Sequence, residues 1–488
     1  MPKPSDIGTL RARQICHGCI GEGFLTAEIE SGASAAECSY CGETEPAITL
    51  DELAKRIATA FDQHFYRTSD QPDYWEYTLL SDRESSYEWE RSGEPVLDAI
   101  ESAAGLASGP AKDVLAILEH DHEDFELAKM GEEAEFSSDS HYDERGPSDA
   151  EWLKEWRSFE ISLKSEARFF NRAGASHLSD VFGAVDKLRT VTGASLVVPV
   201  GPKSGGLTEL VRARVFQSPV KLEECLRRPD IFLGPPPASA ASGGRMNARG
   251  ISVFYGATDL DTAIAEVRPP VGSTVVAAEF KLVRPLKLLD LTELENAVEK
   301  GSIFDPTFKR RLERVAFMKS LSRLLTKPVM PDDEALEYLA TQAVSDFLAT
   351  ENDPLLDGIL FDSVQSKNGR NVVLFHKAAR IVQMEIPEGT EIVVHSLFDA
   401  DETPEFDYEV TEETPVKGQH EPMKEELKWR QIQHLAMDDG LPESDARLPS
   451  LAIDLETVAV HQIAWAKFEY NNQRVRRRRF EKSTNRDF

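Results

Sequence analysis

Apolar residues recur at helical spacing through the first 200 residues. Each of three stripes repeats every three or four positions, which places its members on one side of a helix. The first follows Thr49-Leu50-Asp51-Glu52, a pattern typical of a capped helix start, so we expect a helix to begin near Asp51. The pattern predicts a helical domain over residues 51–200. The stripes are Leu53, Ile57, Phe61 and Phe65; Val114, Leu115 and Leu118; and Trp152, Trp156, Phe159 and Leu163.

The pattern changes near Gly201, where short apolar runs separated by turn residues replace the helical stripes. Two helical segments interrupt these runs, at 308–324 and 333–349. We therefore predict a mixed α/β domain over residues 201–385, followed by an acidic extension over 386–488 that ends in a basic run. The chain as a whole is expected to be a multidomain α+β protein. The predicted strands are 211–216, 251–255, 275–283, 358–361 and 371–375.

Composition narrows the class of protein. The chain has 488 residues, a hydrophobic fraction of 41% and a formal net charge of −30. This charge opposes nonspecific attraction to nucleic acids and to anionic membranes. The sequence contains neither an apolar run of about 20 residues, the length that spans a bilayer, nor an apolar signal-peptide core. We expect a cytoplasmic protein with no membrane or nucleic-acid partner.

Four of the five cysteines form two Cys-x-x-Cys pairs near the N-terminus, Cys16 with Cys19 and Cys38 with Cys41. Such pairs can place four thiolates around one Zn²⁺ ion. Residues 1–50 are also too few to build a core unaided, which a metal cross-link would remedy. We predict a zinc ribbon over residues 1–50 with a structural Zn²⁺. Four reduced or redox-active thiols are the alternative.

The spacing of Arg172 and His177 is that of the Arg-x4-His motif of HEPN ribonucleases. The motif is short, and an arginine and a histidine that satisfy neighbouring helices explain it better. A nucleic-acid-binding or RNA-cleaving protein would use this pair, the zinc ribbon and the basic run at 474–480. The net charge opposes that hypothesis.

A glycine-rich turn and an isolated acid stand out in the second half. Gly243 to Gly250 leads into the strand that ends at Tyr255, and glycines let a backbone pass close to a ligand. The turn has neither GxGxxG spacing nor a Walker lysine, so dehydrogenase and P-loop functions lack support. Glu266 is one acid within a small-residue helix. From periodicity alone it is more simply a surface acid or a partner of Arg268.

Residues 207–380 resemble the RES domain family, which is named for an arginine, a glutamate and a serine. Met246 departs from the family pattern, because many members have tryptophan there. The residues before this region resemble the HEPN-related part that precedes some RES domains. The matching residues, in order, are Arg212 with Arg214, Gly244, Arg245, Asn247, Gly250, Tyr255, Glu266, Ser363 and Asn371.

The resemblance implies a fold similar to that of ADP-ribosyltransferases and an enzyme that destroys NAD⁺, by hydrolysis or by phosphate attack. Breaking the bond between nicotinamide and ribose builds positive charge on the ribose, which one carboxylate can stabilise. By this resemblance Glu266 stabilises the cation, and Ser363 orients the ribose or an incoming phosphate. Arg212 and Arg214 bind the diphosphate, and Tyr255 stacks on nicotinamide. Asn371 supports the site, and Arg245 and Asn247 contact the substrate.

Two further functions remain open. The same fold can transfer ADP-ribose to a macromolecule, which would leave a labelled partner in place of free ADP-ribose. The resemblance also implies a toxin or phage-defence effector, in which an antitoxin or a trigger protein controls the activity. The long N-terminal region can replace that control. A homo-oligomer is compatible with the sequence, but the sequence does not specify one.

Overall fold

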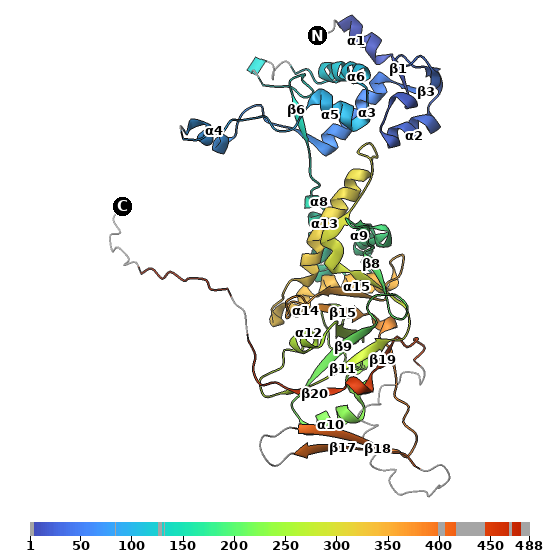
Figure 1. Ribbon diagram of the computed structural model, residues 1–488, viewed down its shortest axis with the longest axis vertical. Helices are drawn as coiled ribbons and strands as arrows, with labels where there is room; N and C mark the ends of the chain where they lie inside the picture. Colours follow the sequence, from blue (N-terminus) through green and yellow to red (C-terminus); the bar gives the residue numbers. More distant parts are fainter. Residues whose placement is uncertain are drawn as a thin grey trace. The chain divides into compact units, whose positions relative to one another are not determined.

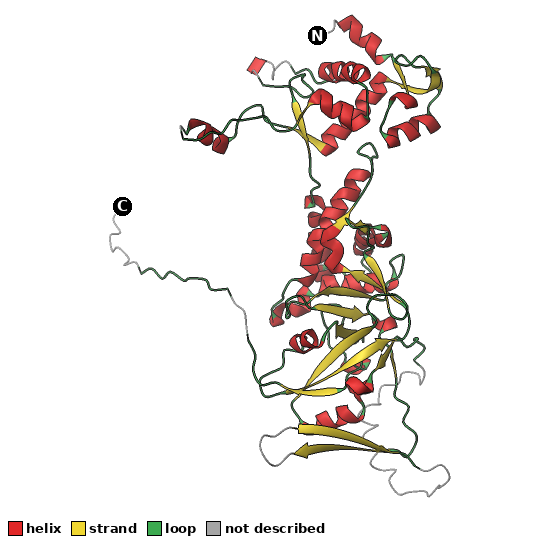
Figure 2. Ribbon diagram, in the orientation of Figure 1, coloured by secondary structure: helices red, strands yellow, loops and turns green. Residues whose placement is uncertain are grey.

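The computed structural model describes residues 4–82, 84–124, 129–130, 132–398, 406–415, 445–467 and 471–479. The chain divides into two compact units, each of which contains two stretches of sequence. The first unit is Met1–Leu196 with Thr292–Lys327, and the second is Val197–Leu291 with Pro328–Phe488. Figure 1 follows the elements along the chain, and Figure 2 separates helices from strands. The protein is a mixed α/β structure with helices and a large mixed sheet.

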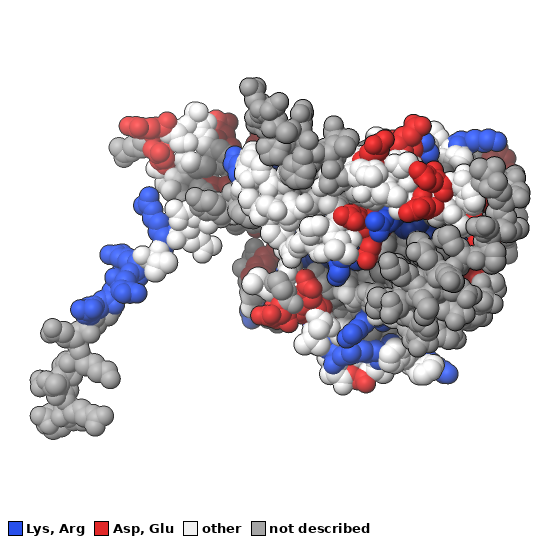
Figure 3. Space-filling model, turned by 90° about the horizontal axis from the view of Figure 1, so that it is seen from below, with Lys and Arg blue, Asp and Glu red and all other residues white. Residues whose placement is uncertain are grey.

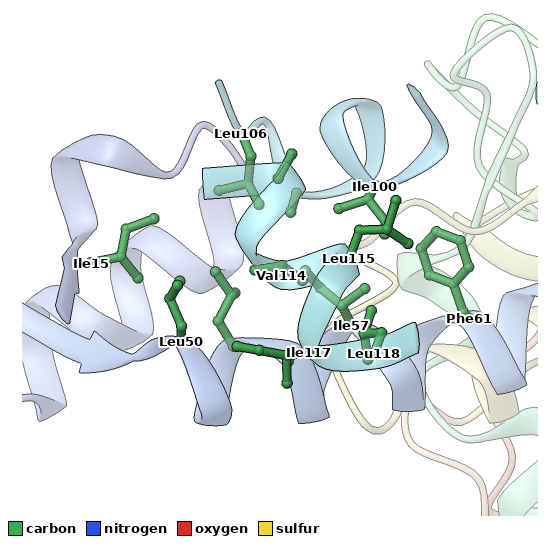
Figure 4. Packing of buried hydrophobic residues seen from close by; sticks show 14 of the residues in the cluster. Ile15, Leu50, Ile57, Phe61, Ile100, Leu106, Val114, Leu115, Ile117 and Leu118 are labelled. Atoms are coloured by element: carbon green, nitrogen blue, oxygen red, sulfur yellow. The ribbon is translucent and has the colours of Figure 1, made fainter. Parts of the chain in front are cut away.

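Helix α3 (Leu50–His64) organises the core of the first unit. Thr49 Oγ1 accepts a hydrogen bond from the Glu52 amide at 3.2 Å, which confirms the predicted helix start. Leu53, Ile57 and Phe61 of α3 pack against α5 (Val96–Ala104) and α6 (Ser108–Asp121), as Figure 4 shows for Ile57 and Phe61. Phe65, the last residue of the predicted stripe, lies beyond the helix on β4 (Phe65–Arg67). The same core includes five buried residues from the segment before α3: Ile15, Ile20, Leu25, Ile29 and Ile48.

The Trp152 stripe forms part of a second helical group in the first unit. It lies on α8 (Ala150–Ser165), which packs with α9 (Arg172–Phe182) and with α13 (Phe308–Thr326). Arg314 fixes α13 to the end of α9 by donating to the carbonyls of Val181, at 3.0 Å, and Gly183, at 2.7 Å. The predicted helix at 308–324 therefore exists, and it belongs to the first unit.

Short elements complete the first unit. Strand β1 pairs with β3, which also pairs with β2, and β6 pairs with both β4 and β5. A fifth pairing joins β7 to β13. Their bounds are α1 (Pro4–Arg11), β1 (Gln14–Cys16), α2 (Gly23–Gly32), β2 (Ala35–Glu37), β3 (Thr44–Thr49), β4 (Phe65–Arg67), α4 (Tyr74–Ser81), β5 (Glu94–Pro95), β6 (His141–Glu144), β7 (Arg189–Thr190) and β13 (Ala297–Val298).

The second unit is built on a ten-stranded sheet in the order β16-β19-β11-β9-β10-β15-β14-β12-β8, with β20 paired to β11. Two pairings, β12 with β14 and β16 with β19, are parallel. Four predicted strands are present as β9, β11, β14 and β15, each within two residues of its predicted bounds, whereas the strand predicted at 251–255 begins later, at Phe254 of β10. The bounds are β8 (Val197–Val200), β9 (Glu209–Phe216), β10 (Phe254–Ala257), β11 (Thr274–Leu282), β12 (Leu286–Asp290), β14 (Gly358–Asp362), β15 (Arg370–Leu374), β16 (Ile381–Val382), β19 (Leu451–Ile453) and β20 (Ala459–Gln462).

The two faces of β9 contact different cores. Leu210 and Phe216 join the larger core of the second unit, whereas Val211 and Ala213 pack beneath α12 (Leu260–Glu266). Successive residues of a strand point to opposite faces, which accounts for this division. The remaining helices of the unit are α10 (Pro219–Arg227), α11 (Pro229–Phe232), α14 (Glu334–Glu337) and α15 (Leu339–Thr350).

The C-terminal segment returns to the large sheet. Leu451 on β19 lies opposite Leu282 on β11 and is fully buried. Part of the predicted 386–488 extension is therefore part of this unit's core, while β17 (Glu391–Phe398) and β18 (Phe406–Glu413) form a separate hairpin. The arginines at 474–479 are exposed, as the basic stretch in Figure 3 shows. Within the described ranges, none of the helices is both long and apolar enough to cross a membrane.

Replacing Leu451 by alanine should weaken the second unit, because the substitution leaves a cavity between β19 and β11. A buried Leu→Ala change costs about 2–5 kcal/mol of unfolding free energy. The midpoint of urea unfolding measures this loss. Leu448→Ala is the matched control, since that side chain is 71% exposed. Equal midpoints for the two variants would show that the C-terminal segment does not support the sheet.

Candidate functional site

Helix α12 places Glu266 at its C-terminal end. The helix begins at Asp259, whose carboxylate accepts a hydrogen bond from the Thr262 amide at 2.8 Å. Ala263, with Ile264 and Val267 beside it, packs onto the apolar face of β9. This packing fixes the orientation of α12 on the sheet. The half-buried side chain of Glu266 is thereby held at the edge of a packed surface.

Two residues that lie 97 and 105 positions further along the chain meet at Glu266. Its Oε1 accepts a hydrogen bond from Ser363 Oγ at 2.6 Å and another from Asn371 Nδ2 at 2.7 Å. Ser363 follows β14 directly, and Asn371 lies on β15 opposite Phe361 of β14. The β14–β15 hairpin therefore presents both donors to one carboxylate oxygen. Hydrogen bonds to an ionised acceptor are among the strongest in proteins.

The hydroxyl of Ser363 is fixed by its own loop. Its Oγ accepts from the amides of Gln365, at 3.1 Å, and Ser366, at 3.0 Å, while it donates to Glu266. The Ser363 amide donates to the Gly369 carbonyl at 2.8 Å and closes the hairpin. The serine proton therefore points at the carboxylate.

The second oxygen of Glu266 is the unsatisfied atom of this cluster. Within the described part of the chain, Oε2 receives no hydrogen bond from any residue, whereas Oε1 receives two. The carboxylate is therefore held by one oxygen and can offer the other to a ligand. Such an arrangement suits the stabilisation of a positive charge or the binding of hydroxyl groups.

The glycine-rich turn is held by Asn247 and Tyr255. The hydroxyl of Tyr255 accepts from the Met246 amide at 3.0 Å and donates to Asn247 Oδ1 at 2.9 Å. Asn247 Nδ2 donates to three backbone carbonyls, those of Ser242, Ala248 and Ile251. A Cβ on Gly244 would lie 2.7 Å from Asn247 Oδ1, which is why glycine is needed there. Burial raises the pKa of Tyr255 to about 12, so its hydroxyl stays protonated.

Arg212 is a half-buried cation on β9. Its guanidinium lies over the Phe254 ring, 4.8 Å from Cζ to the ring centroid. Burial lowers its pKa to about 10, and the nearby charge of Arg214 adds to this effect. Nη1 is buried and has no hydrogen-bond partner among the described residues. Arg214 is exposed and donates to the Phe232 carbonyl at 2.7 Å.

The alternation of β9 separates these arginines from the face that carries α12. Val211 and Ala213 pack beneath α12, so Arg212 and Arg214 start from the opposite face of the strand. Strands β9 and β10 pair through one pair of residues in the described structure, Val211 and Ala257. Arg212 is the next residue after that pair, at the point where the two strands stop pairing.

Helix α15 contacts the glycine-rich turn from the other side. Gln342 Nε2 donates to the Gly244 carbonyl at 2.8 Å, and Thr341 Oγ1 donates to the Arg245 carbonyl. The Arg245 guanidinium lies over the ring of Tyr338, 5.0 Å from Cζ to the centroid. These three α15-side residues were missed from the sequence, although their spacing places them on one helix face.

Met246, where the sequence departs from the expected motif, follows Arg245 in the turn. Its side chain is buried, and Ser345 Oγ of α15 donates to its Sδ at 3.3 Å. The methionine therefore packs against the helix. A thioether fills an irregular space of this kind readily.

The four paired cysteines come together in the first unit. One ligand atom from each of Cys16, Cys19, Cys38 and Cys41 lies within 4.8 Å of the others, so the cluster could hold a metal ion. The sulfur of Cys16 is 3.6 Å from that of Cys41, and the sulfur of Cys38 is 3.8 Å from that of Cys19. Burial raises the pKa of the Cys38 thiol, but backbone N–H groups, that of Cys41 first, outweigh burial and lower it to about 6.

Arg172 and His177 do not form a joint site. Arg172 is exposed at the start of α9, whereas the His177 ring packs against Trp152, Trp156 and Phe159. Residues five positions apart on a helix point in different directions. His177 Nε2 is buried and has no hydrogen-bond partner among the described residues. The aromatic packing accounts for the position of this histidine.

A family model described as the RES domain matches residues 224–409. This span contains Glu266, Ser363 and Asn371 together with the glycine-rich turn and Tyr255. It begins after β9, so Arg212 and Arg214 lie outside it. Neither a curated protein nor a solved structure matches the chain.

The cysteine cluster predicts that the purified protein contains one metal ion per chain. Cys38→Ser should abolish this content, because serine is a poor metal ligand compared with a thiolate. Elemental analysis of the intact protein measures the metal. Cys225→Ser is the control, since Cys225 is outside the cluster. Equal metal contents in the two variants would rule out binding by these cysteines.

The packing of His177 predicts a pH-dependent stability. Burial lowers its pKa in the folded protein, so the stability contributed by the neutral ring is present above an unfolded-state pKa of about 6.5 and is lost as the pH falls. His177→Phe, which keeps an aromatic ring, should lose less stability than the wild type between pH 7 and pH 5. Urea unfolding at the two pH values measures the difference. His120→Gln is the control, because His120 is exposed. Equal slopes for His177→Phe and the wild type would contradict this role.

Proposed function

Because this chain contains a RES domain, we propose that the protein degrades NAD⁺ by cleaving the bond between nicotinamide and ribose. The observation that carries the proposal is the Glu266 carboxylate. Ser363 and Asn371 fix its Oε1, and its Oε2 is left for a ligand. A single oriented carboxylate matches a reaction that develops positive charge and needs no acid to protonate the leaving group.

The proposed reaction breaks the C1′–N bond of the nicotinamide ribose. The bonding electron pair leaves with nicotinamide, which departs as a neutral ring, and the ribose acquires oxocarbenium character. Glu266 Oε2 stabilises this charge and binds the ribose hydroxyls. Water then adds to C1′ and releases a proton to give ADP-ribose. If inorganic phosphate adds in its place, the product is ADP-ribose 1″-phosphate.

Cationic side chains supply candidates for binding the diphosphate. Arg245 lies on the turn that Asn247 and Tyr255 hold, and its guanidinium lies over the ring of Tyr338. Nη1 of the half-buried Arg212 is enclosed and has no hydrogen-bond partner among the described residues, which favours an anionic neighbour. We propose that Arg245 binds the diphosphate through charge-assisted hydrogen bonds. The same role for Arg212 and Arg214 stays a prediction from the resemblance, because both residues start from the face of β9 opposite to α12, which carries Glu266.

We propose that Tyr255 contacts the substrate, whereas Asn247 acts on it through the glycine-rich turn. The hydroxyl of Tyr255 is used by the turn, so its ring is the part that we propose to stack on nicotinamide. The side-chain amide of Asn247 bonds to three carbonyls and to Tyr255. Asn247 would therefore act on the substrate by shaping the turn.

We further propose that the cysteine cluster binds a structural Zn²⁺. A tetrahedral site with Zn–S bonds of about 2.3 Å places neighbouring sulfurs about 3.8 Å apart. The two short sulfur pairs are separated by 3.6 and 3.8 Å, which supports this geometry. Four cysteine ligands complete the coordination shell, so the ion would cross-link β1 and the turns around it and take no part in NAD⁺ cleavage.

The biological role that we propose is that of a toxin or defence effector. Loss of NAD⁺ stops central metabolism, so an enzyme of this kind requires control by an antitoxin or by a trigger protein. ADP-ribosyl transfer to a macromolecule would use the same cluster around Glu266. The two reactions differ in product, because transfer leaves ADP-ribose bound covalently to the acceptor.

Glu266→Gln should lower kcat for NAD⁺ cleavage by ~10²- to 10³-fold, because the amide keeps the shape of the carboxylate and loses its charge. Release of nicotinamide, followed by chromatography, measures the rate. Asp261→Asn on the same helix is the matched control, since Asp261 is exposed. If both variants turn over NAD⁺ at the rate of the wild type, the assignment of Glu266 is wrong.

A further inference from the structure

Helix α15, with the residue that precedes it, applies one continuous face to the glycine-rich turn. Four positions contribute: Tyr338 contacts the Arg245 guanidinium, Thr341 and Gln342 bind carbonyls of the turn, and Ser345 binds Met246. They are spaced at i, i+3, i+4 and i+7, which places them along one side of a helix. Each of the three consecutive turn residues 244–246 is therefore contacted by at least one of these four side chains.

The turn is held from two directions as a result. On the β10 side, Tyr255 Oη accepts from the Met246 amide. On the α15 side, Gln342 and Thr341 donate to the carbonyls of Gly244 and Arg245. An amide of this short segment is thus satisfied by β10, and two of its carbonyls are satisfied by α15. Such a segment has little freedom to move independently of α15.

Tyr338 contacts the side chain of Arg245 in addition to the contacts that α15 makes with the backbone of the turn. Its ring lies 5.0 Å from Arg245 Cζ, within the range of a cation–π contact, and its hydroxyl donates to Glu334 Oε1 at 3.2 Å. An arginine that is already oriented loses less conformational freedom when it binds an anion. We infer that Tyr338 is a positioning residue, which acts through Arg245 on the affinity for an anionic substrate. This inference rests on the proposed function.

The test compares steady-state kinetics of the full-length protein with NAD⁺. Tyr338→Leu should raise KM about five- to thirty-fold, the equivalent of one cation–π contact, and change kcat by less than about two-fold. Tyr338→Phe keeps the ring and should restore the KM of the wild type. Thr350→Ala is the control, because Thr350 is an exposed residue at the far end of α15.

Product inhibition separates positioning from a general weakening of the fold. ADP-ribose carries the diphosphate and nicotinamide does not, so Tyr338→Leu should weaken inhibition by ADP-ribose and leave inhibition by nicotinamide unchanged. A fall in kcat with no change in KM, or equal effects on the two inhibitors, would overturn the inference. So would a Tyr338→Phe variant as impaired as Tyr338→Leu.

A second measurement does not depend on NAD⁺ cleavage. Amide hydrogen exchange of residues 243–250 should be faster in Gln342→Ala than in the wild type, because the variant loses the bond to the Gly244 carbonyl. Thr350→Ala should exchange at the rate of the wild type. If the wild type does not cleave NAD⁺, the proposed function fails, and this experiment still decides whether α15 holds the turn. Unchanged exchange in Gln342→Ala would show that it does not.

Discussion

The site depends on the pair of hydrogen bonds that Ser363 and Asn371 donate to one oxygen of Glu266. They join the end of α12 to the β14–β15 hairpin, two elements about 100 residues apart in the chain. A carboxylate that is partly removed from water needs such partners, because an unpaired charge is costly to bury. Their arrangement on Oε1 alone makes Glu266 asymmetric, with one oxygen structural and the other open to a ligand.

The remaining parts of the second unit maintain this geometry. The sheet supports α12 through Val211 and Ala213, and the C-terminal strands β19 and β20 extend the same sheet beside β11. The glycine-rich turn is fixed between Tyr255 and α15, and it carries Arg245. Rigid elements hold both the acid and the arginine, as preorganised electrostatic catalysis requires.

The sequence predicted the features that depend on local pattern. The start of α3, its buried stripe, four of the five predicted strands and the clustering of four cysteines follow from spacing and periodicity. Periodicity alone favoured a surface role for Glu266, and the order of arginine, glutamate and serine in the RES resemblance was needed to connect it with Ser363. The family match, at residues 224–409, then supported that resemblance over the shared residues 224–380.

Features that depend on long-range pairing were not predictable. Strands β19 and β20 have three and four residues, too few to show alternation, and their burial arises from pairing with β11. The helix at 308–326 shows its own periodicity but not the unit in which it packs. The sequence predicted a helix around Tyr338 and Gln342. It did not predict their contacts with the glycine-rich turn, because these depend on tertiary structure. Which face of the sheet carries Arg212 and Arg214 could be assigned only once the pairing register of β9 was known.

Cleavage of the nicotinamide–ribose bond of NAD⁺ is the activity that we propose for this chain. Incubation of the purified protein with NAD⁺, with and without inorganic phosphate, followed by mass spectrometry of the products, tests it most directly. We expect free nicotinamide with an equal amount of ADP-ribose or, in phosphate, of ADP-ribose 1″-phosphate. Intact NAD⁺ under both conditions would show that the chain does not have this activity.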